Sequence, residues 1–459
     1  MYQIDFHKPI RIYFIGIGGI SMSGLAEILL SEGFTVSGSD RAPSDLTRML
    51  EDRGVNVFYG QKKENLTKDI DLVVYTAAIK SDNPELLAAH KLNIPMLTRA
   101  ELLGQMMKNY ETPVAVSGTH GKTTTTSMIS QILLSAEADP TLSIGGIYRP
   151  IGGNIRVGAS ELFVTEACEY TNSFLSFFPK IGIILNIEED HLDFFKDLAD
   201  IRNSFHRFAQ LLPADGTLII NGDIERCEEL TEGLSCKVIT YGLSSGSDYS
   251  ASQVTYDESG FPSFILSRQS GGERKFSLRV HGDHNILNAL AAIALADLLG
   301  LSDEVIHAGL AAFTGTDRRF EYKGQVNGVN IIDDYAHHPT EIRATLSAAA
   351  QYPHRRLWCV FQPHTYTRTK AFLEEFASAL SLADEIILAD IYAAREKDTL
   401  GISSETLQEK IRSLGHSCHY FPTFEAIENY LLKNCTKDDL LITMGAGDVV
   451  KIGENLLQK

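Results

Sequence analysis

The sequence predicts an α/β fold of three domains, in which two doubly wound parallel sheets flank a central, mostly parallel sheet with an added antiparallel patch. Three observations predict it. The chain has 459 residues, more than one hydrophobic core usually serves, and 44% of them are hydrophobic. Buried-strand runs alternate with helical patterns near both ends of the chain. Short alternating runs separated by glycine- and serine-rich turns are confined to the middle.

The composition is acidic, because 41 lysines and arginines against 59 aspartates and glutamates give a net charge of −18. Such a chain lacks the broad basic face that polynucleotides require, so we expect no nucleic-acid partner. The six cysteines are scattered without a C-x-x-C pair, which is typical of thiols in a reducing compartment. With no signal-like segment and no 18-residue apolar run, the sequence predicts a soluble cytoplasmic protein without a membrane partner.

The first predicted domain, residues 1–108, opens with a buried strand at residues 10–15 and a glycine-rich turn into a helix. The residues of this turn are Gly16, Gly18, Gly19, Ser21, Met22 and Ser23. In dinucleotide-binding domains such a turn brings backbone N–H groups to a diphosphate. The second strand, at residues 34–37, leads to Asp40, where an acidic side chain commonly meets a ribose hydroxyl.

Strands at residues 72–75 and 96–97 and helices at 84–92 and 100–107 complete a small Rossmann-like sheet. A purely structural turn is the alternative, because Ser21 stands at the last glycine position of G-x-G-x-x-G. The domain has no second dinucleotide half and no His/Lys pair suited to hydride transfer. Diphosphate recognition is therefore the expected role.

A second strand–turn–helix pattern covers residues 114–126 and predicts a phosphate-binding loop. Its candidate ATP-binding residues are Gly118, Thr119, His120, Gly121, Lys122, Thr123 and Thr124. Lys122 can reach a transferable phosphate, and a threonine hydroxyl can hold Mg²⁺. Because Val116 occupies the first glycine position of G-x-x-x-x-G-K-T, this loop is two residues shorter than usual. A tight turn before an ordinary helix is the alternative.

Polar side chains follow the next two strands of the central domain, residues 109–315. The strand at 162–165 leads to Glu166, and the strand at 181–185 leads to Asn186 and then to His191. At the carboxyl ends of parallel strands beside a phosphate loop, such groups can ligate a metal or hold substrate. An exposed acidic loop is the alternative for the second cluster.

The rest of the central domain contains an antiparallel patch and an alanine-rich helix. Five short alternating runs predict the patch, at residues 218–220, 238–241, 253–256, 264–266 and 276–280. On the helix that follows, Asn285 and Asn288 are three residues apart and share one face. Their amides could hydrogen-bond an adenine or a ribose.

The third predicted domain, residues 316–459, starts with Arg318 and Arg319, which could grip a phosphate or form a solvated linker. Strands at 330–333, 357–361, 385–388 and 440–443 each lead into a polar cluster. Because the carboxyl ends of such strands meet at one edge, we expect a Rossmann-like domain with a crowded polar rim. Its candidate site residues are Asp334, Tyr335, His337, His364 and Arg368.

The order of these motifs resembles the Mur ligases of peptidoglycan synthesis over essentially the whole chain. The motifs are Gly16-x-Gly18-Gly19-x-Ser21-Met22-Ser23, Gly118-Thr119-His120-Gly121-Lys122-Thr123-Thr124, Asn186 with Asp190-His191, His284-Asn285-x-x-Asn288, Asp334-Tyr335-Ala336-His337-His338-Pro339 and Phe361-Gln362-Pro363-His364-Thr365-Tyr366-x-Arg368. The shortened loop is the family's own form of P-loop, so the resemblance implies a central domain of the P-loop ATPase type.

The resemblance implies ATP-dependent amide formation between UDP-N-acetylmuramate and L-alanine. In that reaction the lactyl carboxylate attacks the γ-phosphorus, an acyl phosphate and ADP form, the amine attacks the acyl carbon, and phosphate leaves. The N-terminal domain would bind the UDP-sugar, the central domain ATP, and the C-terminal domain the amino acid. We expect a monomer or a weak homodimer.

The resemblance also assigns roles to residues. Lys122, Glu166, His191 and Arg368 would be catalytic, with Arg368 gripping the carboxylate of the amino acid. Thr123, Glu166 and His191 would hold two Mg²⁺ ions, for which Mn²⁺ can substitute. Asn285, Asn288, Arg319 and Asp334 would join the P-loop in binding ATP; the N-terminal turn, Asp40, His120 and Asn186 would bind the UDP-sugar; and Tyr335, His337, His364 and Arg368 would bind the amino acid.

Two departures from the family pattern stand out. Cys168 occupies a position where members often have aspartate, so any carboxylate role there is absent. His206 stands where several sister ligases carry a carbamylated lysine, so we predict no carbamylation.

Four alternatives remain open at this point. A ligase that attaches a recycled peptide to the UDP-sugar is nearest, although the 362–368 and 390–396 patterns favour addition of a single alanine. A folate-polyglutamating ligase would lack the N-terminal nucleotide domain. A nucleotide-sensing regulator would have no turnover, and an NAD-dependent dehydrogenase would change nicotinamide absorbance.

Overall fold

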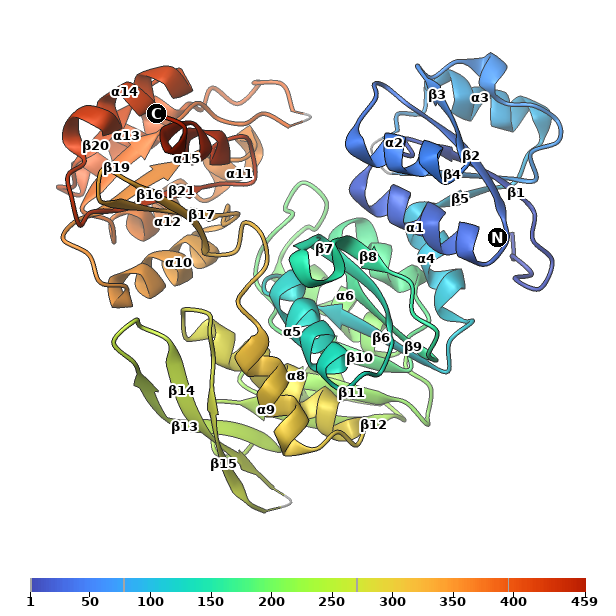
Figure 1. Cartoon of the computed structure of the whole chain (residues 1–459), viewed down its shortest axis with the longest axis horizontal. Helices are drawn as coiled ribbons and strands as arrows, with labels where there is room; N and C mark the ends of the chain where they lie inside the picture. Colours follow the sequence, from blue (N-terminus) through green and yellow to red (C-terminus); the bar gives the residue numbers. More distant parts are fainter. Residues whose placement is uncertain (1, 77–78, 270, 395) are drawn as a thin grey trace.

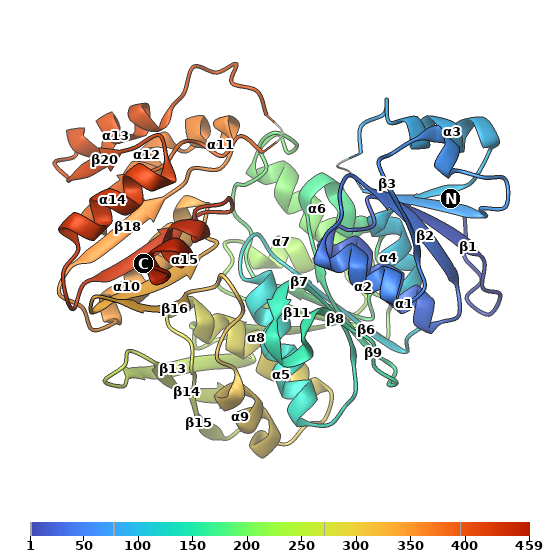
Figure 2. The ribbon, with the colours of Figure 1, turned by 45° about the horizontal axis from the view of Figure 1, so that its top comes forward.

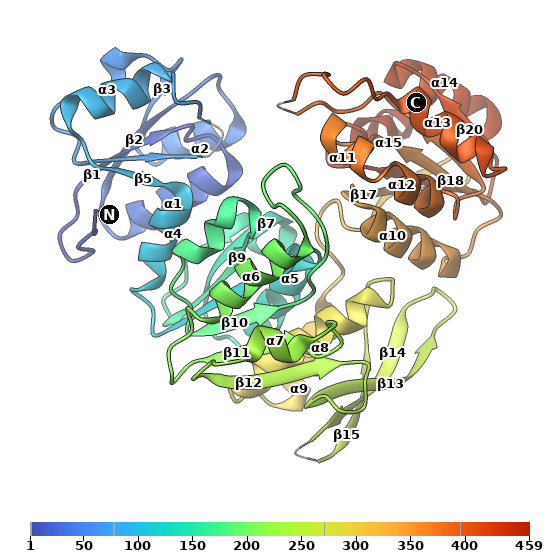
Figure 3. The same cartoon turned by 180° about the vertical axis from the view of Figure 1, so that it is seen from behind.

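The computed structural model describes residues 2–76, 79–269, 271–394 and 396–459, so Arg395 of the 390–396 pattern lies outside it. Three α/β domains, each built on its own sheet, confirm the predicted fold class. In Figure 1 the N-terminal domain (blue) and the C-terminal domain (orange to red) lie above the central domain, on opposite sides of it. Figure 3 shows the same arrangement from behind.

The N-terminal sheet is parallel, with strand order β3-β2-β1-β4-β5. Its elements are β1 (Arg11–Ile15), α1 (Ile20–Ser31), β2 (Thr35–Asp40), α2 (Asp45–Asp52), β3 (Asn56–Tyr59), the 3₁₀ turn η1 (Lys63–Asn65), β4 (Leu72–Tyr75), α3 (Pro84–Leu92), β5 (Met96–Thr98) and α4 (Arg99–Met107). Every predicted element of this domain is present, and α2 and β3 are additional. Because the strand order reverses at β1, the glycine turn lies at the crevice where such sheets bind ligands.

The central sheet has ten described strands in the order β15-β14-β13-β12-β11-β10-β6-β9-β7-β8. The strands are β6 (Thr112–Ser117), β7 (Thr141–Tyr148), β8 (Gly153–Arg156), β9 (Leu162–Ala167), β10 (Ile181–Ile184), β11 (Thr217–Asn221), β12 (Lys237–Gly242), β13 (Tyr249–Tyr256), β14 (Pro262–Arg268) and β15 (Glu273–Ser277). The helices are α5 (Lys122–Ser135), α6 (Leu198–Ala209), α7 (Cys227–Thr231), α8 (His284–Leu298) and α9 (Asp303–Ala312), with 3₁₀ turns η2 (Arg149–Ile151) and η3 (Tyr170–Ser176).

Helices cover both faces of the central sheet, as the side-chain alternation of β6 illustrates. Val114 and Val116 join the core formed with α5, α8 and α9, whereas Ala115 joins the core that contains Phe205 of α6. Successive side chains of a strand point to opposite faces, so a strand covered on both sides reads as a continuous apolar run. This places the P-loop, which follows β6, at the edge of a rigid sheet.

The predicted extent of the antiparallel patch is wrong at two strands. β11 and β12 pair in parallel with their neighbours, and only β13, β14 and β15 form antiparallel pairs on that side. The helices α6 and α7 precede β11 and β12 and return the chain to the starting edge, which makes the next strand parallel. Short alternating runs do not reveal strand direction, so the connecting helices decide it.

The C-terminal sheet has the order β16-β17-β21-β18-β19-β20, parallel except for the edge strand β16. Its elements are β16 (Glu321–Val326), β17 (Val329–Asp334), α10 (Pro339–Gln351), β18 (Leu357–Phe361), α11 (Tyr366–Ala371), α12 (Leu373–Leu380), β19 (Glu385–Leu388), α13 (Ser404–Ser413), β20 (Cys418–Tyr420), α14 (Phe424–Asn434), β21 (Leu440–Met444) and α15 (Val450–Leu457). The carboxyl ends of β17, β18, β19 and β21 share one edge, as the sequence predicts.

The N-terminal domain packs closely on the central domain, and Figure 2 shows α1 beside β8. A Cβ at Gly24 of α1 would lie 1.9 Å from Ile155 Cγ1 of β8, and one at Gly104 of α4 would lie 1.9 Å from the Ser176 carbonyl oxygen. Only glycine permits these approaches. Within the described part of the chain, the structure contains no helix with the length and apolarity needed to span a membrane.

Candidate active site

The P-loop connects β6 to α5 through two glycines that no other residue could replace without strain. Gly118 has φ 149°, and a Cβ there would lie 2.8 Å from Leu185 Cβ. Gly121 has φ 82°, and its Cβ would lie 2.7 Å from Asn288 Oδ1. Positive φ and close approach both require glycine at these two positions. The loop therefore packs closely against the ends of β10 and α8.

Asn186 fixes the loop from the neighbouring strand β10. The His120 backbone N–H donates to Asn186 Oδ1 at 2.8 Å, and Asn186 Nδ2 donates to the His120 carbonyl at 3.0 Å. The Thr119 N–H donates to the Asn186 carbonyl at 3.1 Å. Asn186, predicted as a ligand of the UDP-sugar, thus also orders the phosphate loop.

Lys122, at the first position of α5, is buried against the loop that precedes it. Its ammonium donates to the Thr119 carbonyl at 3.0 Å and to Glu169 Oε2 at 2.9 Å. Burial alone would lower the pKa of Lys122, but the Glu169 carboxylate outweighs burial and raises that pKa above its usual range. Lys122 therefore carries a permanent positive charge beneath the loop.

Glu166 lies beside Thr123 rather than in the loop after its strand. Thr123 Oγ1 donates to Glu166 Oε2 at 3.1 Å, and the Gly145 N–H donates to the other carboxylate oxygen. Burial raises the pKa of Glu166, although these donors and Lys122 oppose the shift. A hydroxyl and a carboxylate brought together in this way suit Mg²⁺, which prefers oxygen ligands.

His191, predicted to share a metal with Glu166, lies close to two other carboxylates. Its Nε2 lies 3.6 Å from Glu169 Oε1 and 3.8 Å from Asp190 Oδ2, and its ring stacks on Tyr170 at 4.5 Å. Glu169 Oε1 is buried and lacks a hydrogen-bond partner within the described residues. Glu169 is thus a site residue that the sequence analysis did not select, although it lies only three positions after Glu166.

A cleft of about 660 Å³ opens between the central and C-terminal domains. The predicted ATP-binding residues that line it are His120, Gly121, Thr124, Asn285, Asn288, Arg319 and Asp334. Asn288 Nδ2 donates to Asn285 Oδ1 at 2.9 Å, so the two amides share one face of α8. Residues from P-loop, α8 and β17, far apart in the sequence, meet in one cavity.

The wall contributed by the C-terminal domain combines the carboxylate of Asp334 with the guanidinium of Arg319. The buried Asp334 accepts hydrogen bonds from the Phe320 and Ala336 N–H groups, and burial raises its pKa to about 6 against the lowering effect of Arg319. The guanidinium of Arg319 lies 5.2 Å from the centre of the Tyr335 ring. Arg318 is held instead by Asp333 at 2.9 Å, so only the second arginine of the pair lines the cleft.

A second cavity of about 320 Å³ contains His191 and most of the predicted amino-acid-binding residues. Arg368 Nη2 donates to Asp190 Oδ1 at 2.7 Å, and its Nη1 lies 3.0 Å from His364 Nδ1. The His337 and His364 rings are 5.5 Å apart. Burial lowers the pKa of each of these histidines to about 4, so both are neutral near pH 7.

One member of this predicted group has other surroundings, and one residue outside the group joins it. Tyr335 does not line the second cavity among the described residues; its ring lies under Arg318, at 4.8 Å, and 5.5 Å from His337. Asp190, which the sequence analysis left without a role, forms the ion pair with Arg368. That pairing joins two domains and is invisible in a local pattern.

The N-terminal glycine turn uses several predicted ligand residues for its own architecture. Asp40 Oδ2 accepts from the Gly18 N–H at 2.8 Å, while Met22 and Ser23 are buried in the core of the domain. Ser21 Oγ accepts from Arg99 Nη1 at 2.9 Å. Arg99, at the start of α4, was not singled out by the sequence analysis, because nothing local indicates that its guanidinium returns to the turn.

The three parts of the chain match three models of one family. Residues 11–111 match the Mur ligase family catalytic domain, residues 116–296 the Mur ligase middle domain, and residues 318–447 the Mur ligase glutamate ligase domain. The matches follow the N-terminal, central and C-terminal sheets in order.

Individual relatives agree with these models. The chain is 62% identical to a UDP-N-acetylmuramate–L-alanine ligase of Agathobacter rectalis, over the full length of both chains. The solved UDP-N-acetylmuramate-alanine ligase of Thermotoga maritima superimposes with a TM-score of 0.82 at 28% identity, and a murein peptide ligase of Psychrobacter arcticus with 0.74 at 26%; each match covers 98% of both chains. With identity this high over its whole length, the chain belongs to the Mur ligase family.

Proposed function

We propose that this chain joins L-alanine to the lactyl carboxylate of UDP-N-acetylmuramate at the expense of ATP, in peptidoglycan precursor synthesis. The lactyl carboxylate attacks the γ-phosphorus, and an acyl phosphate and ADP form; the amino group then attacks the acyl carbon and phosphate leaves. Residues 1–108 bind the UDP-sugar, residues 109–315 bind ATP, and residues 316–459 bind the amino acid. The names of the relatives support this choice of substrates.

The observation that carries the proposal is a single loop, residues 186–191, that borders both cavities. Asn186 and Glu188 line the cleft that contains the P-loop, and Asp190 and His191 line the cavity that contains Arg368. A phosphoryl group in the first cavity and an amine in the second would meet across this loop. Such positioning lowers the entropic part of the barrier for two successive transfers.

The roles of the chain's own residues follow from their charges. Lys122 supplies positive charge to the phosphoryl group as it moves, and Arg368 binds the amino acid's carboxylate. The neutral imidazole of His337, whose Nδ1 donates to the Tyr335 carbonyl, can accept a hydrogen bond from the attacking amine at Nε2. The neutral imidazole of His364 accepts from Arg368 at Nδ1 and so carries its proton on Nε2. Asn285, Asn288, Arg319 and Asp334 hold the nucleotide, and the turn from Gly16 to Ser23 holds the diphosphate of the sugar nucleotide.

The donor set also fits Mg²⁺, with Mn²⁺ as a substitute. We propose that Thr123 and Glu166 hold one ion, and that Glu166 and His191 hold a second, with Glu169 beside them. Glu169 Oε1, which is buried and accepts no hydrogen bond from the residues that the structure describes, is the kind of atom that a cation satisfies. When bound, Mg²⁺ neutralises the charge of the transferring phosphate.

An ADP-release assay tests the proposal. With UDP-N-acetylmuramate and ATP present, L-alanine should give the highest kcat/KM among L-alanine, glycine, L-serine and a tripeptide. ADP release that proceeds equally well without the UDP-sugar would contradict the proposal, since γ-phosphate would then pass to water.

A second candidate is a ligase that adds a recycled peptide to the same sugar nucleotide. The fold similarity to the murein peptide ligase favours it. The 62% identity over the whole chain to an L-alanine ligase, against 26% for the peptide ligase, supports the first candidate instead. Preference for the tripeptide in the same assay would reverse this order.

A further inference from the structure

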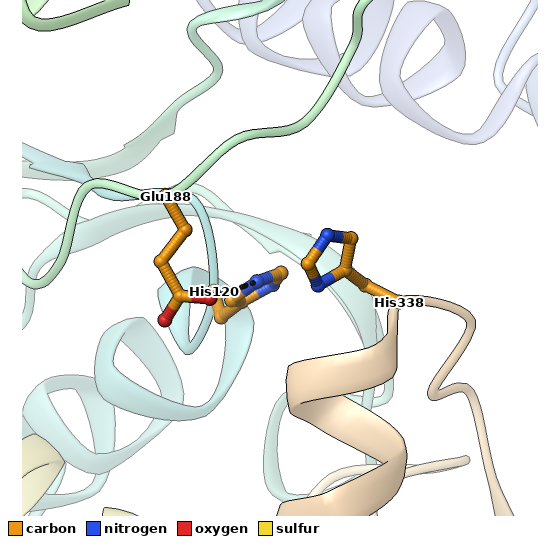
Figure 4. Close-up of side chains that lie close together, drawn as sticks. All are labelled: His120, Glu188 and His338. Atoms are coloured by element: carbon orange, nitrogen blue, oxygen red, sulfur yellow. Dashed lines mark ion pairs between the residues drawn. The ribbon is translucent and has the colours of Figure 1, made fainter. Parts of the chain in front are cut away.

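A cluster of His120, Glu188 and His338 joins the central domain to the C-terminal domain (Figure 4). Each side chain offers one ligand atom, and these atoms lie within 4.8 Å of one another. His120 belongs to the P-loop and Glu188 to the loop after β10. His338 is the N-cap residue of α10. The cluster shares no residue with Thr123, Glu166 and His191, the proposed Mg²⁺ ligands.

One nitrogen of the cluster makes no hydrogen bond to any residue that the structure describes. His120 Nε2 is buried and makes no hydrogen bond within the described residues, and its nearest charged neighbour is Glu188 Oε2 at 3.7 Å. A buried polar atom left unpaired costs about 1–3 kcal/mol, so such atoms call for a partner.

In each histidine, one of the two ring nitrogens already has a hydrogen-bonding partner in the protein. His120 Nδ1 lies 3.2 Å from Glu341 Oε1, and His338 Nε2 lies 3.0 Å from the Glu189 carbonyl oxygen. Histidines that ligate metals usually donate their second ring N–H to a carboxylate or a backbone carbonyl, which fixes the tautomer and the ring orientation. Both histidines here have that arrangement, so the atom of His120 that remains for a metal is Nε2 and that of His338 is Nδ1, which also accepts a hydrogen bond of 3.4 Å from the Thr340 N–H at the start of α10.

The surroundings favour a positive charge at this point. Glu341 Oε1 lies 3.2 Å from His120 Nδ1, and Glu188 Oε2 lies 3.7 Å from His120 Nε2. A metal ion bound at His120 Nε2 would balance the charge of these two carboxylates.

We propose that His120, Glu188 and His338 form a transition-metal site of the Zn²⁺ class that bridges the central and C-terminal domains. Two imidazoles and one carboxylate suit Zn²⁺ better than Mg²⁺, which prefers oxygen ligands. Zn²⁺ bonds of about 2.0–2.2 Å set neighbouring ligand atoms about 3.4 Å apart in a tetrahedron, so ligand atoms now within 4.8 Å of one another need to converge by up to about 1.4 Å. A water molecule would complete the coordination.

Equilibrium dialysis of the full-length chain against Zn²⁺, with excess Mg²⁺ present, tests the site. The wild type should bind one equivalent that His338→Asn binds at least about 10–100-fold more weakly. Asparagine is a good helix N-cap, so this variant keeps the start of α10 intact. His307→Asn, at an exposed histidine of α9, is the matched control and should bind like the wild type.

A second variant separates this site from zinc bound at thiols or at the Mg²⁺ ligands. Glu188→Gln, which retains a hydrogen-bonding group for Thr340, should lose the same equivalent. Equal zinc affinity in the wild type, His338→Asn and Glu188→Gln would overturn the proposal.

Discussion

At the scale of single residues, the active-site charges are already paired with one another. Lys122 is balanced by Glu169, which is 2% exposed, and Arg368 by Asp190, which is 8% exposed. A phosphate or a substrate carboxylate must therefore compete with a buried protein carboxylate for each cation. This competition favours ligands that bring good geometry and additional contacts.

Replacing Lys122 should separate catalysis from folding. Lys122→Ala should lower turnover by about 10³-fold or more, because it removes charge that stabilises the transferring phosphate. Lys180→Ala, at a half-exposed lysine of the same domain, should keep wild-type turnover. Retained activity in a Lys122→Ala protein with the wild-type circular dichroism spectrum would remove the P-loop from the mechanism.

Arg368 should act on the amino acid and leave ATP binding unchanged. Arg368→Lys keeps the charge but loses the planar fork, so the KM for L-alanine should rise about 10–100-fold, which corresponds to one or two charged hydrogen bonds. The KM for ATP should change little, because Arg368 lines only the second cavity. A KM for ATP that rises as much as the KM for L-alanine would contradict the assignment.

At the scale of elements, local signals predict strand ends well and domain contacts poorly. The P-loop, the glycine turn and the rim of the third sheet were predictable, because glycine-rich turns and runs of apolar strand residues are properties of adjacent residues. The direction of β11 and β12 was not predictable from their own residues, because it depends on the helices α6 and α7 that precede these strands. Asp190 with Arg368, and Glu341 with His120, lie far apart in the sequence, so no periodicity could reveal them.

Helix α1 should depend on a glycine for its contact with the central domain. Gly24→Ala would drive a Cβ into Ile155, and overpacking of this kind typically costs about 1–3 kcal/mol. Gly153→Ala, on β8, is a matched control, because its Cβ would meet nothing within 4 Å. The melting temperature should fall for the first variant and stay near wild type for the second; equal melting temperatures would show that α1 can retreat without cost.

At the scale of the whole molecule, polar contacts hold the central and C-terminal domains together. Three side-chain pairs connect the two domains: Arg368 with Asp190, Thr340 with Glu188 and His120 with Glu341. The two cavities lie along the same interface between the domains, so the residues that line them also take part in the contact between the domains.

The contribution of His120 to stability should depend on pH in a defined direction. Its pKa is raised from 6.5 to about 9, so its stabilising effect is complete below pH 6.5 and is lost as the pH rises through about 9. With a chelator present, wild type should melt a few degrees above His120→Gln at pH 6, and the difference should shrink by pH 10. A difference that grows with pH would contradict this charge assignment.

Ligands should draw the three domains together, because water must be kept from an acyl phosphate and the proposed sites lie on different domains. Small-angle scattering should give a smaller radius of gyration with the UDP-sugar and a non-hydrolysable ATP analogue than without them. Profiles that superimpose in the two conditions would argue against closure.

The central claim is that the γ-phosphate passes to the lactyl carboxylate and not to water. Labelling both oxygens of that carboxylate with ¹⁸O and analysing the released phosphate by mass spectrometry tests this most directly. The proposed acyl phosphate predicts one ¹⁸O in the phosphate per turnover and one retained in the amide. Phosphate without ¹⁸O, released while the amide forms, would contradict the account.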